Sequence, residues 1–316
     1  MDTNLFRYQS PLLLRNGHLA TIYPALTRKT KPLIPYERER FETSDNDFLD
    51  VDWLKSGNEK VVIISHGLEG NSDRPYVLGM ANAFFAHGYD VLAWNYRGCS
   101  EEINHQKTMY HSGATDDLDF IVSLAERRYG NVILIGFSLG GNLTLKYLGE
   151  RKSRKSIKKA VTFSVPLDLH QGALNLKNAK NFVYERRFLR SLESKLIKKH
   201  EQYPEEIALE RFSEVKHIID FDDIFTGPIH GFENAEDYYK KCSSKFFLDG
   251  IEVPTLVVNA KNDPLLPPAC LDSSLFKNNR QLTFLSPSHG GHCGFAAFNV
   301  EKRYWSEEIA LRFCQT

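Results

Sequence analysis

The chain contains the stretch Gly136-Phe137-Ser138-Leu139-Gly140, which lies between an apolar run at 131–135 and a helix-like run at 141–148. A strand, then Gly-x-Ser-x-Gly, then a helix is the context of a nucleophile elbow, a sharp turn that exposes a serine hydroxyl above a sheet edge. The serine of such a turn has a strained backbone, and its neighbours must be small so that strand and helix can approach each other. The stretch predicts a nucleophile at Ser138, with a simple tight turn as the alternative.

Several other apolar runs have the length and composition of strands buried in a parallel sheet; they lie at 61–65, 90–96, 160–165, 255–259 and 281–285. Helical patterns alternate with most of them, which predicts an α/β fold with a mostly parallel, doubly wound sheet and helices on both faces. Runs at 37–43 and 48–54 predict an antiparallel pair at one edge. Ligands of such folds bind beyond the carboxyl ends of the strands, so we expect the reactive residues just after strands.

The alternation of strand and helix stops between residues 169 and 249, where charged and aromatic segments have helical spacing. This block predicts a helical cap inserted into a core made of 37–168 and 250–316. Residues 1–36 contain several prolines and little periodicity, and they predict an N-terminal arm over the surface rather than a functional segment. The cap aromatics belong either to its core or to an acyl pocket; they include Phe221, Phe225, Phe232, Tyr238 and Tyr239.

The composition argues against several classes of protein. The 316 residues carry 40 Lys+Arg and 40 Asp+Glu, so the formal net charge of zero predicts no nucleic-acid partner. No run approaches the roughly 18 apolar residues that span a bilayer, and the first residues do not resemble a signal peptide. The five cysteines lack metal-binding spacing, and they predict reduced thiols in a cytoplasmic protein. We expect no metal and no organic cofactor.

A serine nucleophile needs a general base, and the base needs an acid that orients it. Asp263 follows the strand at 255–259, and His292 follows the strand at 281–285. The order Ser, Asp, His is that of α/β-hydrolases. We therefore predict a triad of Ser138, Asp263 and His292. The alternatives are Asp168, Asp222 or Asp223 for the acid and His289 for the base.

The oxyanion of an acyl-transfer reaction needs backbone N–H donors. We predict that Leu139, directly after the nucleophile, supplies one donor. The loop after the first parallel strand supplies the other, and we assign it to the N–H of Leu68 in His66-Gly67-Leu68-Glu69-Gly70. A glycine-rich turn without this role is the alternative.

Five separated motifs, between about residues 15 and 300, resemble the YheT-like (AB-hydrolase 4) subfamily of α/β-hydrolases, a group of predicted esterases. They are Arg15-Asn16-Gly17-His18-Leu19-Ala20-Thr21-Ile22, His66-Gly67-Leu68-Glu69-Gly70, Asn95-Tyr96-Arg97-Gly98, Gly136-Phe137-Ser138-Leu139-Gly140-Gly141-Asn142 and His289-Gly290-Gly291-His292-Cys293-Gly294-Phe295. The resemblance implies a carboxylesterase whose triad falls on the same three residues. It also implies ester or lipid substrates. The cap is the most variable part of such folds, so the resemblance does not identify the particular substrate that the cap selects.

The sequence thus predicts a serine hydrolase that cleaves small ester substrates, with short or medium acyl chains, through an acyl-enzyme. Two alternatives remain. The same acyl-enzyme serves an acyltransferase or ester synthase if an alcohol or thiol replaces water. A non-catalytic binding protein on a hydrolase-like fold is the other, although a complete triad argues against it.

Overall fold

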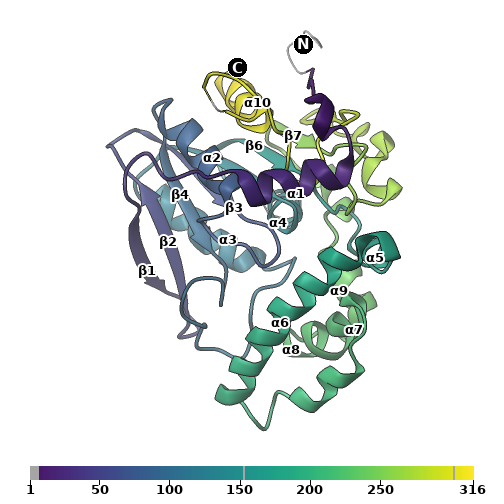
Figure 1. Cartoon of the computed structure of the whole chain (residues 1–316). Coiled ribbons are helices and arrows are strands. Elements are labelled where there is room, and N and C mark those ends of the chain that lie inside the picture. Colours follow the sequence, from purple (N-terminus) through teal and green to yellow (C-terminus); the bar gives the residue numbers. More distant parts are fainter. Residues whose placement is uncertain (1–6, 152–153, 302) are drawn as a thin grey trace.

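The apolar runs of the sequence form one sheet of eight strands in the order β1-β2-β4-β3-β5-β6-β7-β8 (Figure 1). The computed structural model describes residues 7–151, 154–301 and 303–316. The strands are β1 (Glu37–Glu42), β2 (Phe48–Leu54), β3 (Lys60–Ser65), β4 (Asp90–Asn95), β5 (Asn131–Phe137), β6 (Ile157–Phe163), β7 (Thr255–Val258) and β8 (Leu282–Leu285). β2 pairs antiparallel with both β1 and β4, and the other pairs are parallel, so the predicted α/β sheet and its antiparallel edge are confirmed.

The central strands are apolar on both faces because helices cover both faces. Val132 and Leu134 of β5 belong to one buried cluster, whereas Ile133 and Ile135 belong to the other. The first cluster lies under α3 (Thr115–Glu126) and α4 (Leu139–Glu150), and the second lies under α2 (Pro75–Phe85) and α10 (Trp305–Gln315). Successive strand residues point to opposite faces, which explains why β5 reads as a continuous apolar run.

Residues 169–249, all of which the structure describes, contain helices and turns and no strand. The helices are α5 (Leu169–Leu176), α6 (Phe182–Gln202), α7 (Ile218–Phe221), α8 (Gly227–Ile229) and α9 (Ala235–Cys242). A π-helical turn, Asp222–Thr226, joins α7 to α8. These elements share their own buried cluster, and Figure 1 shows them beside one end of the sheet. The predicted helical insertion is therefore present.

The N-terminal segment differs from the irregular arm that the sequence predicts, because it contains helix α1 (Gly17–Thr27). Asn16 caps this helix by accepting a hydrogen bond from the N–H of Leu19 at 3.1 Å. Glycine and proline are typical of turns, and here Gly17 begins the helix and Pro24 lies inside it. The helix also lacks the alternation of apolar and charged residues from which a surface helix is recognised.

The glycines of the elbow are required by close backbone contacts. A Cβ atom on Gly140 would lie 2.4 Å from the carbonyl oxygen of Ser65 and 2.5 Å from that of His66. A Cβ atom on Gly136 would lie 2.4 Å from the carbonyl oxygen of Gly140. All three distances are far below van der Waals contact, so helix α4 approaches β3 and β5 this closely only because both positions are glycine.

We expect Gly140→Ala to lower the free energy of unfolding by about 3 kcal/mol, the upper range for overpacking, because backbone atoms cannot move aside as a side chain can. Urea denaturation measures the change. Gly172→Ala in α5 is the matched control, since its nearest neighbour is 3.7 Å away. That control should stabilise the chain by up to about 1 kcal/mol through helix propensity. Equal midpoints for the two variants would contradict the close approach.

Candidate active site

Ser138 lies on a strained turn between β5 and α4. Its backbone angles are φ 53° and ψ −117°, outside the regions that L-residues prefer. The turn is held by the N–H of Ser138, which donates to the carbonyl oxygen of Phe163 at 2.8 Å, and by the N–H of Gly141, which donates to the carbonyl oxygen of Ser138 at 2.9 Å. This backbone directs the hydroxyl away from the sheet at the amino end of α4, as the Gly-x-Ser-x-Gly motif predicts.

His292 lies within hydrogen-bond distance of both Ser138 and Asp263, although the three residues are far apart in the sequence. The Oγ atom of Ser138 is 2.9 Å from Nε2 of His292. The Nδ1 atom of His292 is 2.9 Å from Oδ2 and 3.1 Å from Oδ1 of Asp263. Asp263 follows β7 and is 5% exposed, and its Oδ1 also accepts a hydrogen bond from the N–H of Leu265 at 2.9 Å. The carboxylate is thus held in place while it contacts the imidazole.

The backbone around His292 is fixed by three side chains. Its own N–H donates to Oγ1 of Thr21 at 2.9 Å, and Thr21 belongs to helix α1. The N–H of Cys293 donates to Oγ of Ser164 at 2.9 Å, and the N–H of Gly291 donates to Oδ1 of Asn262 at 3.0 Å. Helix α1 therefore supports the site, although the sequence predicts a surface arm for this segment. Thr21 lies in the Arg15–Ile22 motif, but the sequence does not predict its contact with His292, which is 271 positions away.

The charge state of His292 depends on two opposing effects. Burial would lower the pKa of the imidazole, but the negative charge of Asp263 beside Nδ1 outweighs burial and raises this pKa well above 6.5. The imidazolium form is thus stabilised by its neighbour. A base with this property accepts a proton readily and holds it next to the Ser138 oxygen.

The other acids and the other histidine that the sequence offered lie in different places. Asp168 caps α5 and forms an ion pair with Lys245 at 2.6 Å. Asp222 accepts a hydrogen bond from the hydroxyl of Tyr239 at 2.7 Å, and burial raises its pKa to about 6. Asp223 accepts from the N–H of Ala235 at 3.0 Å. His289 has its Nδ1 atom 3.2 Å from the carbonyl oxygen of Arg15.

The loop that follows β3 presents an unused backbone donor beside Ser138. Among the residues that the structure describes, neither the N–H of Leu68 nor that of Leu139 has a hydrogen-bond partner. Both residues line the pocket that contains Ser138. The N–H of Leu139 lies at a helix amino end, which attracts an anion, and the N–H of Leu68 is an unpaired donor in the loop, so these two positions suit the predicted oxyanion donors.

His66 holds this loop as a neutral imidazole. Burial lowers its pKa to about 3, so the ring carries one donor and one acceptor. Its Nδ1 atom is 2.8 Å from the carbonyl oxygen of Gly67, and its Nε2 accepts from the N–H of Tyr96 at 3.3 Å. The hydroxyl of Tyr96 donates to the carbonyl oxygen of His66 at 2.7 Å. His66 thus fixes the peptide that precedes Leu68, a role that sequence reasoning missed.

Glu69 connects the same loop to the cap. Its backbone has φ 53°, and its carboxylate accepts from the hydroxyl of Tyr110 at 2.6 Å. Lys195 of α6 pairs with the carboxylate at 2.8 Å, and Ser191 of α6 also donates to it. The side chains of Glu69 and Lys195 are 6% and 14% exposed, so this is a largely buried ion pair. Helix α6 is therefore in direct contact with the loop that carries the N–H of Leu68.

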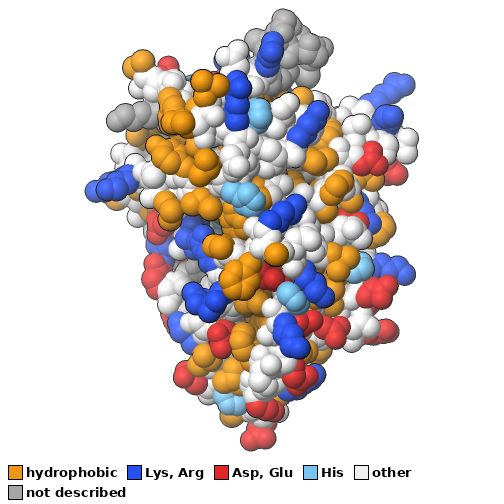
Figure 2. Space-filling model, turned by 45° about the vertical axis from the view of Figure 1, so that its right-hand side comes forward, with side chains coloured by type: hydrophobic (Ala, Val, Ile, Leu, Met, Phe, Trp, Pro, Cys, Tyr) orange, Lys and Arg blue, Asp and Glu red, His pale blue; other side chains and the backbone are white. Residues whose placement is uncertain are grey.

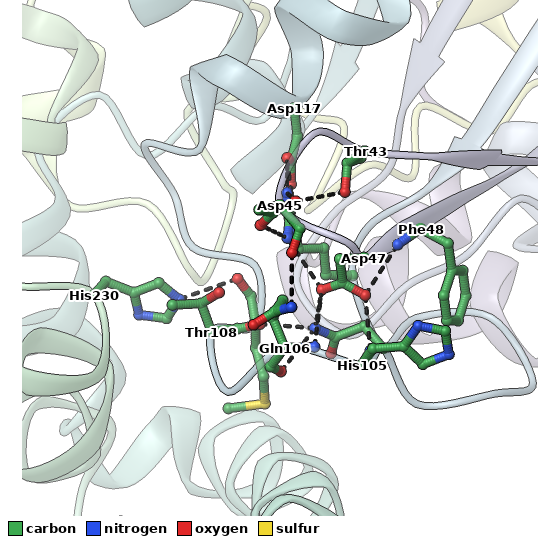
Figure 3. A network of polar contacts seen from close by, with 12 residues as sticks. Thr43, Asp45, Asp47, Phe48, His105, Gln106, Thr108, Asp117 and His230 are labelled. Atoms are coloured by element: carbon green, nitrogen blue, oxygen red, sulfur yellow. Dashed lines mark hydrogen bonds and ion pairs between the residues drawn. The ribbon is translucent and has the colours of Figure 1, made fainter.

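A polar network at the base of the cap fixes the loop that carries Tyr110 (Figure 3). Asp47 accepts from Arg97 at 3.0 Å, from Asn104 at 2.6 Å and from the N–H of His105 at 2.7 Å. Arg97 also pairs with Asp117 at 2.8 Å. On the cap side, Nε2 of His230 is 3.0 Å from the carbonyl oxygen of Met109. The residues just before Tyr110 are thus held between the β1–β2 turn and the cap.

Two pockets meet at Ser138 and His292. The first, of about 130 Å³, extends under the cap and is mainly apolar; Leu169, Ala173, Leu176, Phe188 and Leu192 line it. Tyr238 and Tyr239 also line it, whereas Phe221 and Phe225 are buried in the cap core. The second pocket, of about 200 Å³, lies between α1, α6 and the loop after β3. An acyl chain and a leaving group could thus lie on opposite sides of one hydroxyl.

Metal-binding clusters and membrane-spanning helices are both absent from residues 7–151, 154–301 and 303–316. Within these ranges no group of three or more His, Cys, Asp or Glu side chains is arranged to hold a metal ion. Within the same ranges no helix combines the length and the apolar character needed to cross a bilayer. The five cysteines are free thiols, and three of them are buried.

Known proteins share the fold of this chain. The alpha/beta hydrolase fold family matches residues 60–296. YheT of Escherichia coli, named as a presumed esterase, is 33% identical over 292 residues, which cover 89% of this chain and 84% of that protein. The phospholipase ABHD3 of Bos taurus is 28% identical and matches 84% of this chain and 68% of its own length.

A yeast relative and a solved structure give a similar result. The monoacylglycerol lipase of Saccharomyces cerevisiae is 29% identical and matches 81% of this chain and 59% of its own length. The esterase Pf2001 of Pyrococcus furiosus superposes with a TM-score of 0.58 at 17% sequence identity, over 91% of this chain and 97% of that one, which reflects a shared fold. The chain therefore belongs to the alpha/beta hydrolase fold family and, within it, to the relatives of YheT.

Proposed function

We propose that this chain hydrolyses carboxylic esters, with Ser138 as nucleophile, His292 as general base and Asp263 as the acid that orients the base. One observation carries the proposal: Nε2 of His292 lies 2.9 Å from the Ser138 hydroxyl, and its other ring nitrogen faces Asp263. The names of the relatives, which are esterases, lipases and phospholipases, support the same reaction class.

The reaction begins when Nε2 of His292 accepts the proton of Ser138 as the oxygen attacks the ester carbonyl. Asp263 favours the tautomer with its proton on Nδ1, which leaves Nε2 free to accept, and it stabilises the imidazolium that forms. The strained turn at Ser138 keeps the hydroxyl exposed to the pocket, so little reorganisation precedes the attack.

The negative charge then develops on the former carbonyl oxygen. The N–H groups of Leu68 and Leu139 donate to it in our proposal, and each such donor contributes about 3–4 kcal/mol to transition-state stabilisation. His292 returns its proton to the departing alcohol, which leaves an acyl group on Ser138. A water molecule activated by the same imidazole releases the acid and regenerates the hydroxyl.

The apolar pocket under the cap suits the acyl chain, and its size favours short or medium chains. We expect Ala173→Phe to fill part of this pocket, since Ala173 lies in its wall and is 6% exposed. Each methylene that no longer fits should lower kcat/KM by about fourfold, the equivalent of 0.8 kcal/mol. The ratio of octanoate to acetate turnover measures the effect. The ratio for Ala173→Val should lie between those of the wild type and Ala173→Phe. An unchanged ratio would place the acyl chain in the other pocket.

The proposed function is tested with p-nitrophenyl esters of increasing chain length, together with a fluorophosphonate that labels activated serines. We expect turnover of the esters and labelling at Ser138. Product analysis with added ethanol separates hydrolysis from acyl transfer, because transfer yields the ethyl ester from the same intermediate. Absence of both turnover and labelling would indicate a protein that binds without catalysis.

We further propose a cytoplasmic location. Five free thiols without a disulfide among the described residues suit a reducing compartment. Cell fractionation with an antibody against the native protein tests this location, and recovery of the protein from an oxidising compartment would contradict it.

A further inference from the structure

Helix α1 exposes the residues that a soluble helix normally buries. Leu19, Ile22, Tyr23 and Leu26 have the i, i+3, i+4, i+7 spacing of one helix face, and they are 53%, 38%, 42% and 77% exposed. Residues 17–27 include no Asp, Glu, Lys or Arg. The opposite face, with Ala20 and Pro24, is the one that packs on the protein. The apolar stripe thus points outward.

The stripe is part of a larger apolar surface. Phe298 is 65% exposed, and its ring centroid lies 6.4 Å from that of Tyr23. We define the α1 face as Leu19, Ile22, Tyr23, Leu26 and Phe298. An exposed apolar surface of several large side chains on one element usually marks a site of interaction.

The exposed charges at the two ends of α1 are positive, whereas Glu301, whose side chain is 62% exposed and pairs with Arg303, lies three residues from Phe298. Residues 7–36 contain no Asp or Glu, and Arg15, Lys29 and Lys31 are exposed at the two ends of α1. Helix α6 touches α1 through a stacked contact of His18 with Tyr184.

Helix α6 adds to this positive charge. It exposes Arg187 and Arg190, whereas the nearby Glu185 is buried and accepts from the N–H of Ile218 at 3.0 Å. Figure 2 shows Lys and Arg side chains over the whole face it presents, whereas most of the acidic side chains lie in its lower half. The upper part of this face is therefore more positive than the lower part.

The second pocket opens beside the α1 face. Its wall includes Ile22 and Leu26 of the stripe and Arg187 of α6, and it reaches Ser138 and His292. A molecule that lies against the α1 face therefore has direct access to the candidate nucleophile.

We propose that the α1 face docks onto the surface of an anionic lipid bilayer. An interfacial helix buries its apolar side at the boundary of headgroups and acyl chains, while neighbouring cations attract anionic lipids. A second copy of the chain fits less well, because two such faces would bring like charges together. An anionic bilayer therefore matches both the apolar stripe and the cations at the two ends of α1. Docking in this way places the entrance of the second pocket at the membrane surface.

Vesicle flotation tests the proposal with the whole chain and without turnover. We expect binding to phosphatidylcholine vesicles that contain phosphatidylglycerol, weaker binding to phosphatidylcholine alone, and a decline as salt rises. The double variant Leu19→Asp with Tyr23→Asp should lower the bound fraction at least about tenfold, since it places two charges in the apolar stripe. Neither residue lines either of the two pockets that meet at Ser138, so turnover of a soluble short-chain ester should persist.

Two further variants control this experiment. Phe246→Asp changes a side chain that is 59% exposed on a segment packed along α4, on the other side of the sheet, and it should bind vesicles like the wild type. Lys29→Glu with Lys31→Glu should weaken binding to anionic vesicles about fivefold or more for each cation and leave the weak binding to neutral vesicles unchanged.

Three outcomes would overturn the docking proposal. The first is that the wild-type protein does not float with anionic vesicles. The second is that the Leu19/Tyr23 variant binds vesicles as well as the wild type. The third is that the protein binds no vesicles but forms a dimer in size-exclusion chromatography, and that the Leu19/Tyr23 variant abolishes this dimer. The last result would assign the α1 face to self-association. The soluble-ester assay reports separately on the proposed function, so failure of one proposal is distinguishable from failure of the other.

Discussion

Ser138→Ala lowers kcat/KM for a p-nitrophenyl ester by about 10⁴-fold or more, because the chain loses the only group placed to form the acyl-enzyme in our proposal. The free energy of unfolding should change by less than about 1 kcal/mol, since the variant keeps the backbone turn and removes one side-chain hydrogen bond. Initial rates and urea denaturation measure the two quantities. The variant should also lose fluorophosphonate labelling.

A matched control for this variant is Ser274→Ala, which removes an exposed hydroxyl that only contacts Asp272. That control should keep full activity. Turnover by Ser138→Ala at a rate near that of the wild type, with a normal denaturation curve, would remove Ser138 from the mechanism and with it the proposed acyl-enzyme.

Asp263→Asn is expected to lower kcat by about 10⁴-fold while leaving the fold intact, because an asparagine amide can donate to Nδ1 and so hold His292 in the wrong tautomer. The matched control is Asp168→Asn, which alters a cap of α5 and an ion pair with Lys245. We expect that control to lose stability but to keep its rate within a few-fold. If Asp168→Asn abolished activity and Asp263→Asn did not, the acid would be misassigned.

The pH dependence of kcat/KM provides an independent measure of the same contact. His292 acts as a base only when it is neutral, so activity falls as the pH drops below its pKa in the free enzyme. Asp263 raises that pKa well above 6.5, so the acid limb of the wild-type profile should have its midpoint above pH 6.5. Removing the negative charge lowers the pKa, and the residual activity of Asp263→Asn should therefore have its acid limb at lower pH. A limb that does not move would show that the two groups are not coupled.

Much of the fold could be predicted because its signals are local. The run at 131–135 and the two glycines around Ser138 define a strand and a turn within a few residues, and the contacts of Gly136 and Gly140 show why no larger residue fits. The placement of reactive groups after strands follows from the parallel sheet alone. Asp263 and His292 were predicted on that basis, and they lie within hydrogen-bond distance of each other.

The remaining features depend on contacts between distant segments. The sequence favours Asp263 but leaves Asp168 as an alternative, since both follow strands, and only the packing shows that Asp168 is paired with Lys245. Helix α1 was missed because its exposed side is apolar, the reverse of the usual pattern. Thr21 and His66 each lie within a motif of the sequence, but no motif states their contacts, so their roles emerge only when the backbone around His292 and Leu68 is in place.

The buried pair between Glu69 and Lys195 limits how the cap of this fold can be exchanged for another. Lys195 is encoded with the cap, whereas Glu69 belongs to the core loop next to Leu68. A chimaera that received a foreign cap without a cation at position 195 would leave a buried carboxylate uncompensated, at a cost of about 3–5 kcal/mol. Helix α6 should therefore be inherited with the core, and diversification of substrate range is easiest in α5 and in the segment from α7 to α9.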